Sequence, residues 1–333
     1  MGAIARRRFL AGAGALLAAH ATWPVRGRAP YRIGLLPEYY GTYLAWFHDA
    51  MRREGWQEGR EFAVFQPEGL PFGVRHEEAA RRVVEARPDI ILTVGTHYAL
   101  AAQHLTKKIP IVVWASGYPV ETGLADSLSR PGRNVTGNAA YAGTSIWGKL
   151  LQLLREVRPG AKRVAVLMCY LPPFHPQAET DMIYRDLREG ARDLGLAMHI
   201  TPLARAEQVD EALADLARSA PDVVVLTTGL GIWPVRQKVL EFALARRWPT
   251  IADVHWDPRD KLQPMMSYSP SMELLLRESV GYVVRILRDG AKAAELPMLR
   301  PAKFELSVNQ RTAKALGVSI PSNVLLRADQ VIE

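Results

Sequence analysis

The sequence has little of what disulfides, metal sites and nucleotide sites require. Cys169 is the only cysteine in 333 residues, which excludes an intrachain disulfide and a cysteine-based zinc site. No phosphate-binding Gly-x-x-x-x-Gly-Lys-Ser/Thr loop, Gly-x-Ser-x-Gly nucleophile turn or His-Glu-x-x-His pair occurs. A cysteine without an activating histidine beside it is more typical of a small buried apolar residue than of a nucleophile. We therefore predict a protein that is not an enzyme and that uses no cofactor or metal.

Acidic residues are absent from the first part of the chain. None precedes Glu38, and Arg6-Arg7-Arg8 stands directly ahead of Phe9-Leu10 and an uncharged apolar run over residues 11–19. This layout is typical of a twin-arginine export signal, and the run is too short for a hydrocarbon core that requires about 20 apolar residues. We predict a cleaved signal peptide over residues 1–29. A general secretory signal is the alternative route, and a buried N-terminal helix is disfavoured by the three arginines.

The net charge of +8 depends largely on this leader. Five arginines precede Tyr31, so the remaining chain carries 37 basic and 34 acidic residues, a net charge of +3. Basic and acidic residues alternate along it, as on solvated helix faces, which gives no support to nucleic-acid binding. No cysteine lies in the leader to carry a lipid anchor. We expect a soluble, monomeric protein in the periplasm of a double-membraned bacterium.

Short runs rich in Val, Ile and Leu alternate with segments of helical periodicity almost throughout. Expected strands are Tyr31–Leu36, Glu61–Gln66, Asp89–Val94, Pro110–Trp114, Val135–Asn138, Arg163–Met168, Ala197–Pro202, Asp222–Thr227, Thr250–Asp253 and Lys303–Asn309. Expected helices are Tyr43–Gly55, Glu77–Arg87, Ser145–Val157, Thr180–Gly195, Val209–Ser219, Val235–Arg246, Met272–Arg288 and Thr312–Leu316. The strands are apolar on both faces, which is typical of parallel strands covered by helices. The alternation predicts an α/β protein with doubly wound parallel sheets.

The same succession of a helix, a proline turn and an apolar strand occurs in both halves of the chain. Arg87-Pro88-Asp89 and Ala220-Pro221-Asp222 each end a helix and lead into a strongly apolar strand. Because ligands of open parallel sheets bind beyond the carboxyl ends of the strands, those ends are the first place to look for a site. Small or hydroxyl residues stand there at Gly95-Thr96, Ala115-Ser116-Gly117 and Thr227-Thr228-Gly229.

Three segments carry a family resemblance. The first is Arg130-Pro131-Gly132-Arg133-Asn134-Val135-Thr136-Gly137, and the second is Met266-Ser267-Tyr268-Ser269-Pro270. The third is the tail from Pro301 to Glu333, which includes Lys303-Phe304-Glu305-Leu306-Ser307-Val308-Asn309, Ala315-Leu316-Gly317-Val318 and Leu325-Leu326-Arg327-Ala328-Asp329-Gln330-Val331-Ile332-Glu333. In this order the segments resemble the substrate-binding proteins of bacterial ABC transporters, in the tryptophan/tyrosine-binding-like group with the type I periplasmic binding protein fold. Leu262-Gln263-Pro264-Met265 stands where members typically carry Gly-Gly-Leu, so the pocket is expected to differ there.

The resemblance implies two doubly wound parallel-sheet lobes joined by a multi-crossing hinge, with a solute captured between them. We expect one lobe over residues 30–137 and 265–290 and the other over residues 138–264 and 300–333. The implied function is the periplasmic solute-binding component of an ABC importer, which delivers a small organic solute to the permease and ATPase subunits. A periplasmic sensor that presents its solute to a signalling receptor is the alternative.

Candidate solute contacts follow from the strand ends. In the first lobe, the hydroxyls of Thr96 and Ser116, beside helix N–H groups, suit a carboxylate, although helix capping alone would also explain them. The neighbours His97 and Tyr118 are further candidates, as are the rings of Tyr39 and Tyr40 after the first strand.

The second lobe offers candidates after three of its strands. Tyr170 and Thr228 each follow a strand, and Asp253 ends another, where its carboxylate could neutralise an ammonium group. An exposed acid at a strand end is the plain alternative for Asp253. Together these residues predict a solute that is amino-acid-like or aromatic.

Overall fold

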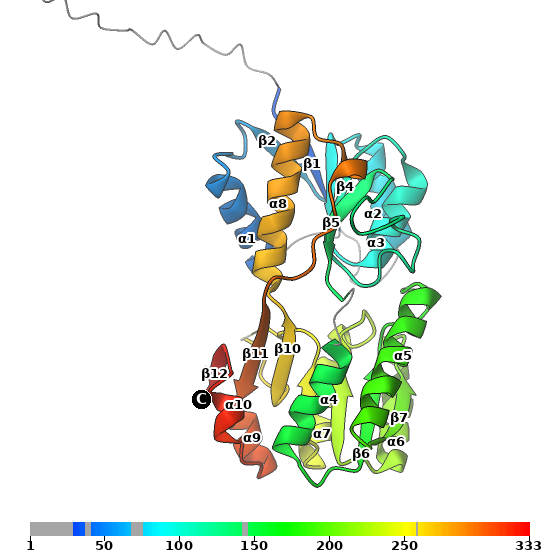
Figure 1. The fold of residues 1–333 in the computed structure, drawn as a ribbon, viewed down its shortest axis with the longest axis vertical. Helices are drawn as coiled ribbons and strands as arrows, with labels where there is room; N and C mark the ends of the chain where they lie inside the picture. Colours follow the sequence, from blue (N-terminus) through cyan, green and yellow to red (C-terminus); the bar gives the residue numbers. More distant parts are fainter. Residues whose placement is uncertain (1–28, 37–40, 68–75, 142–145, 258) are drawn as a thin grey trace, which may run out of the picture.

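The computed structural model describes residues 29–36, 41–67, 76–141, 146–257 and 259–333. Residues 1–28 of the predicted signal peptide and the two tyrosines Tyr39 and Tyr40 lie outside the described residues. The described chain forms two lobes, each built on one sheet (Figure 1). None of the described helices is both long enough and apolar enough to cross a membrane.

The first lobe contains a five-stranded parallel sheet in the order β2-β1-β3-β4-β5. Its strands are β1 (Tyr31–Leu36), β2 (Phe62–Phe65), β3 (Ile90–Thr93), β4 (Ile111–Ser116) and β5 (Val135–Ala139). Helices α1 (Gly41–Arg53) and α8 (Met272–Asp289) share one apolar cluster with the sheet, and α2 (His76–Glu85) and α3 (Thr96–Leu105) share another. The sheet is therefore covered on both faces, as its apolar strands predict.

The second lobe contains a seven-stranded sheet in the order β12-β11-β10-β9-β8-β6-β7, in which only β10 and β11 pair antiparallel. Its strands are β6 (Arg163–Met168), β7 (Ala197–Pro202), β8 (Val223–Leu226), β9 (Thr250–Ala252), β10 (Met266–Pro270), β11 (Phe304–Asn309) and β12 (Gln330–Ile332). Its helices are α4 (Ile146–Val157), α5 (Gln177–Asp193), α6 (Val209–Ser219), α7 (Arg236–Ala245), α9 (Gln310–Leu316) and α10 (Ser322–Leu325). It also contains the short 3-10 turns η1 (Ala206–Gln208) and η2 (Trp233–Val235), whereas a third such turn, η3 (Ala293–Glu295), belongs to the first lobe.

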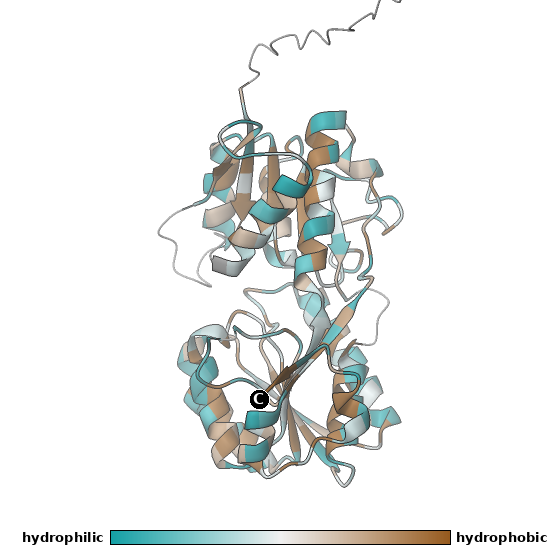
Figure 2. Ribbon diagram, turned by 90° about the vertical axis from the view of Figure 1, so that its left-hand side faces the viewer, coloured by the Kyte–Doolittle hydropathy of each residue, from teal (hydrophilic) through white to brown (hydrophobic). Residues whose placement is uncertain are grey.

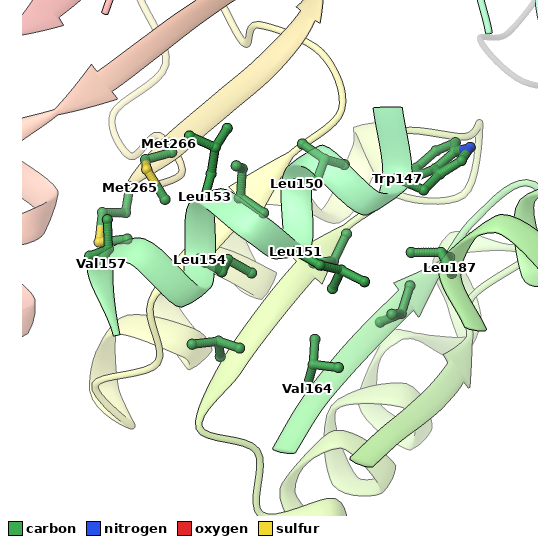
Figure 3. Packing of buried hydrophobic residues seen from close by; sticks show 14 of the residues in the cluster. Trp147, Leu150, Leu151, Leu153, Leu154, Val157, Val164, Leu187, Met265 and Met266 are labelled. Atoms are coloured by element: carbon green, nitrogen blue, oxygen red, sulfur yellow. The ribbon is translucent and has the colours of Figure 1, made fainter. Parts of the chain in front are cut away.

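Helix α4 shows how the sequence builds this core. Apolar side chains recur at Trp147, Leu150, Leu151, Leu154 and Val157, a spacing that places them on one helix face. All five are buried against the strands of the second sheet (Figure 3). Figure 2 shows the same division through both lobes, with apolar strands inside and polar surfaces on the covering helices.

The chain passes between the lobes at three places. These are the stretch between β5 and α4, the residue between β10 and α8, and the stretch from η3 to β11.

The lobe boundaries differ from the predicted ones at two points. The first sheet continues to Ala139 rather than 137, and β10 belongs to the second sheet because it pairs with both β9 and β11. The predicted first-lobe segment 265–290 therefore begins after Pro270.

Candidate functional site

The carboxyl ends of the two sheets face each other where the lobes meet. We call this region the interlobe face; it is formed by Thr96, His97, Ser116, Gly117 and Tyr118 of the first lobe and Tyr141, Trp147, Tyr170, His175, Glu179, Thr228 and Asp253 of the second. Parallel strands place all their carboxyl ends at one edge, so residues far apart in the sequence converge there.

Asp253 is the centre of the second-lobe side. It follows β9, is 1% exposed, and accepts hydrogen bonds at Oδ1 from the Thr228 amide (2.9 Å) and hydroxyl (2.6 Å). The Tyr170 hydroxyl donates to Oδ2 at 2.9 Å. Burial raises the pKa of Asp253 to about 6, although these hydrogen bonds favour the ionised form. The exposed-acid alternative for Asp253 is therefore wrong, because the carboxylate is enclosed.

Aromatic rings surround this acid. The Tyr141 hydroxyl lies 3.2 Å from the Tyr170 hydroxyl, and both rings contact Trp147, with centroids 5.5 and 6.1 Å away. Tyr170 also meets His175 edge-on, at 4.8 Å between centroids. Such edge-to-face contacts hold the rings in fixed orientations. The group presents apolar ring surface beside a buried negative charge.

Thr96 and Ser116 meet on the first-lobe side, 3.3 Å apart at their hydroxyl oxygens. Capping does not explain Thr96, because the N-cap of α3 is Gly95, at φ 79°. The Thr96 hydroxyl accepts a hydrogen bond from the Gly117 amide at 3.0 Å and donates one to Glu179 Oε1 at 2.9 Å. Glu179 lies on α5 of the other lobe, so this hydrogen bond joins the two lobes.

Three histidine rings extend the contact beside Thr96. His97 has its centroid 5.6 Å from that of His76 and 4.7 Å from that of His175, which comes from the second lobe. His97 is 8% exposed, and neither of its ring nitrogens has a hydrogen-bond partner in the described structure. Burial, together with the two neighbouring histidines, lowers the pKa of His97 well below its usual value. His97 is therefore neutral at pH 7.

Tyr118 projects from the first lobe into the second. It is 2% exposed, packs in the core of the second lobe, and donates a hydrogen bond to Asp186 on α5 at 2.8 Å. Trp147 Nε1 donates to the same hydroxyl at 3.0 Å. The structure thus uses Tyr118 as an interlobe contact, and its role as a solute contact stays a prediction.

Seven of the nine predicted contacts lie at the interlobe face, and the other two, Tyr39 and Tyr40, lie outside the described residues. The sequence reasoning missed Tyr141, Trp147, His175 and Glu179. The one signal available was the i, i+4 spacing of His175 and Glu179, which places the two side chains together at the start of α5, with His175 Nδ1 3.2 Å from Glu179 Oε2.

Neither metal nor thiol chemistry finds support in the described residues. They contain no group of three or more His, Cys, Asp or Glu side chains suited to hold a metal ion. Cys169 is 1% exposed, and burial raises the pKa of its thiol far above the usual value. A thiol held protonated in this way is not an activated nucleophile.

The model of the ABC transporter substrate binding protein family matches residues 75–332, which is most of the chain. The chain belongs to this family. Membership confirms the resemblance found in the sequence and the prediction of a substrate-binding protein rather than an enzyme. It also agrees with the two α/β lobes, each built on a parallel or nearly parallel sheet.

One sequence relative and two solved structures are similar to this chain. A tyrosine-binding protein of Clostridioides difficile is 24% identical over 278 residues, covering 81% of this chain and 75% of the relative. A conserved domain protein of Vibrio cholerae matches with a TM-score of 0.78 at 22% identity, over 91% of this chain and 100% of its own. An ABC domain from Streptococcus pneumonia, solved in complex with L-Trp, matches with a TM-score of 0.78 at 19% identity over the same shares. These likenesses confirm the type I periplasmic binding protein fold.

Proposed function

We propose that this protein is the periplasmic solute-binding component of an ABC importer. It captures a small organic solute that bears an amino group and an apolar or aromatic body, and it delivers the solute to permease and ATPase subunits at the inner membrane. The observation that carries the proposal is Asp253, a buried carboxylate at the interlobe face whose described hydrogen-bond donors, Thr228 and Tyr170, are both uncharged.

A buried carboxylate without a cation is costly, because desolvation penalises its charged form. The raised pKa of Asp253 reports this cost. An ammonium group placed beside it would supply the missing charge, and the rings of Tyr141 and Tyr170 would contact the rest of the solute. The relatives named for tyrosine and crystallised with L-Trp bind molecules of this kind.

Capture requires that the solute favour the closed arrangement of the lobes. The hydrogen bonds Thr96–Glu179 and Tyr118–Asp186 cross the interlobe face, so separation of the lobes breaks both. A solute that binds both lobes shifts the population toward closure only by its extra affinity for the closed state. The permease would then recognise the closed form.

Calorimetry tests the capture step. Purified protein is titrated with a panel of amino acids and the corresponding amines, and we expect at least one aromatic or apolar member to bind. Asp253→Asn should weaken that binding by 100-fold or more, whereas Asp210→Asn, at an exposed acid of the same lobe, should leave it unchanged. Equal affinities of Asp253→Asn and the wild type would contradict the assigned role of Asp253.

A second experiment tests export and transport. Replacement of both Arg6 and Arg7 by lysine should retain the protein in the cytoplasm if the twin-arginine route is used. Cells that lack the gene should lose uptake of the labelled solute, and the wild-type gene should restore it. Unchanged uptake in those cells would refute the transport role and favour a sensing role.

A further inference from the structure

The first-lobe end of the interlobe face has the features of a carboxylate-binding site. Thr96 stands at the start of α3, a ten-residue helix whose N-terminal N–H groups favour negative charge. The hydroxyls of Thr96 and Ser116 lie within 3.3 Å of each other at this helix end. In a protein that binds amino acids, this place would suit the carboxylate of the solute.

A carboxylate of the protein itself already occupies that place. Glu179, 3% exposed, accepts a hydrogen bond at Oε1 from the Thr96 hydroxyl at 2.9 Å, and its Oε2 lies 3.2 Å from His175 Nδ1. The fit depends on Gly117, because a Cβ atom there would overlap Glu179 Oε1. Glu179 is therefore built into the interlobe face, with contacts to both lobes.

The interlobe face thus carries two buried acids, Glu179 and Asp253. The described hydrogen-bond partners of Glu179 are Thr96 and His175, and those of Asp253 are Thr228 and Tyr170. Neither acid pairs with any lysine or arginine that the structure describes. A solute carboxylate brought beside Glu179 would face a like charge in a desolvated region, where the one described group next to Glu179 that can carry a positive charge is His175. A solute ammonium group would be attracted to both acids.

The nearby histidines add unpaired hydrogen-bonding atoms. Both ring nitrogens of His97 and the Nε2 atom of His175 are buried without a partner in the described structure. Since His97 is held neutral, one of its nitrogens carries a free lone pair. Buried polar atoms of this kind indicate a missing hydrogen-bonding group. A solute ammonium group could donate to the bare nitrogen of His97, whereas the other nitrogen of the ring carries the proton and requires an acceptor.

We propose that the solute is an amine without a carboxylate, such as a decarboxylated aromatic amino acid; this inference rests on the proposed function. The reason is that Glu179 takes the place of the solute carboxylate between the lobes. The ammonium group pairs with Asp253, the aromatic body contacts Tyr141 and Tyr170, and Glu179 closes the lobes onto Thr96. Specificity follows from charge repulsion against the carboxylate of the parent amino acid.

Matched pairs of solutes test this inference. Tyramine is compared with tyrosine, and tryptamine with tryptophan, by calorimetry on the wild-type protein at pH 7.5. For whichever pair binds, we expect the amine to bind at least tenfold more tightly than the corresponding amino acid. Glu179→Gln removes the negative charge and should reduce this preference tenfold or reverse it, whereas Glu189→Gln, at an exposed position of α5, should leave it unchanged.

The outcomes separate this inference from the function on which it rests. Tighter binding of the amino acids by the wild type would overturn the amine preference while leaving solute capture intact. Binding of neither class would overturn both. An amine preference that survives in Glu179→Gln would overturn the role of Glu179. If that variant does not fold, as judged by circular dichroism, the wild-type comparison alone decides the solute class.

Discussion

The Tyr118 hydroxyl of the first lobe donates a hydrogen bond to Asp186 of the second lobe at 2.8 Å. The same oxygen accepts the indole N–H of Trp147, so one tyrosine connects its own lobe to both α4 and α5. Because Tyr118 is 2% exposed and packs among the core residues of the second lobe, its ring would become solvent-exposed if the lobes separated. Tyr118 therefore contributes apolar burial as well as hydrogen bonds to the closed state.

Tyr118→Phe should weaken closure without unfolding either lobe. The ring is retained, but Asp186 loses a donor and Trp147 loses an acceptor. Arg185 still pairs with Asp186, so the cost of about 1–3 kcal/mol arises mainly from the buried Trp147 N–H that is left unpaired. Solute affinity should fall roughly 5- to 100-fold. Calorimetry measures the change, and Tyr184→Phe, on the outer surface of α5, is the control. Unchanged affinity in Tyr118→Phe would show that these hydrogen bonds do not favour the closed form.

Gly117→Ala should block closure sterically. The nearest atoms to an added Cβ belong to Glu179 of the other lobe, so the substitution leaves the first lobe itself undisturbed. We expect an unchanged melting temperature of the solute-free protein, a radius of gyration in small-angle scattering that stays constant when solute is added rather than falling as in the wild type, and solute affinity at least tenfold lower. Gly160→Ala is the matched control, because an added Cβ there meets no atom within 4 Å. Wild-type affinity in Gly117→Ala would contradict the close approach of Glu179.

Most of the fold was predictable from local patterns. Strands β1, β6 and β7 and helix α6 have the predicted bounds, because apolar runs and helical spacing depend only on nearby residues. Helix α3 was expected only as a helix near Thr96, without bounds, since it is buried on nearly every side and lacks a polar face. Strand β10 is not among the predicted strands, because its pairing with β9 and β11 is a tertiary effect.

The candidate site was predictable only within each lobe. The expectation that ligands bind beyond the carboxyl ends of the strands located Tyr170, Thr228 and Asp253, because parallel strands bring these ends together. It could not locate Glu179, which meets Thr96 only when the two lobes come into contact. No pattern along the chain relates a residue near the start of α5 to a residue at the start of α3, so the occupied carboxylate site became visible only in the structure.

Asp253 should make the stability of the solute-free protein fall as the pH rises. Its pKa is raised from 3.8 to about 6, so the folded protein binds more protons than the unfolded chain between these values. The wild type should therefore lose up to about 3 kcal/mol of unfolding free energy relative to Asp253→Asn between pH 3.5 and pH 7. Urea unfolding at unit pH intervals measures both proteins. Parallel stability curves would show that Asp253 ionises without penalty.

His97 should make closure sensitive to acid. Its pKa is lowered in the closed protein, so closure is fully favoured above the ordinary value of 6.5 and is lost as the pH falls below it. The groups that face His97 are His76 on α2, Tyr98 on α3 and His175 before α5, with Glu179 beyond His175. Protonation of His97 would bury a positive charge against two other imidazoles.

Small-angle scattering of the solute-saturated protein between pH 7.5 and pH 5 measures this effect as an increase in the radius of gyration. His97→Asn removes the titrating ring and should keep the radius constant over that range. His199→Asn, at an exposed histidine that pairs with Asp215, should behave as the wild type does. An increase that persists in His97→Asn would contradict the assignment of the acid response to His97.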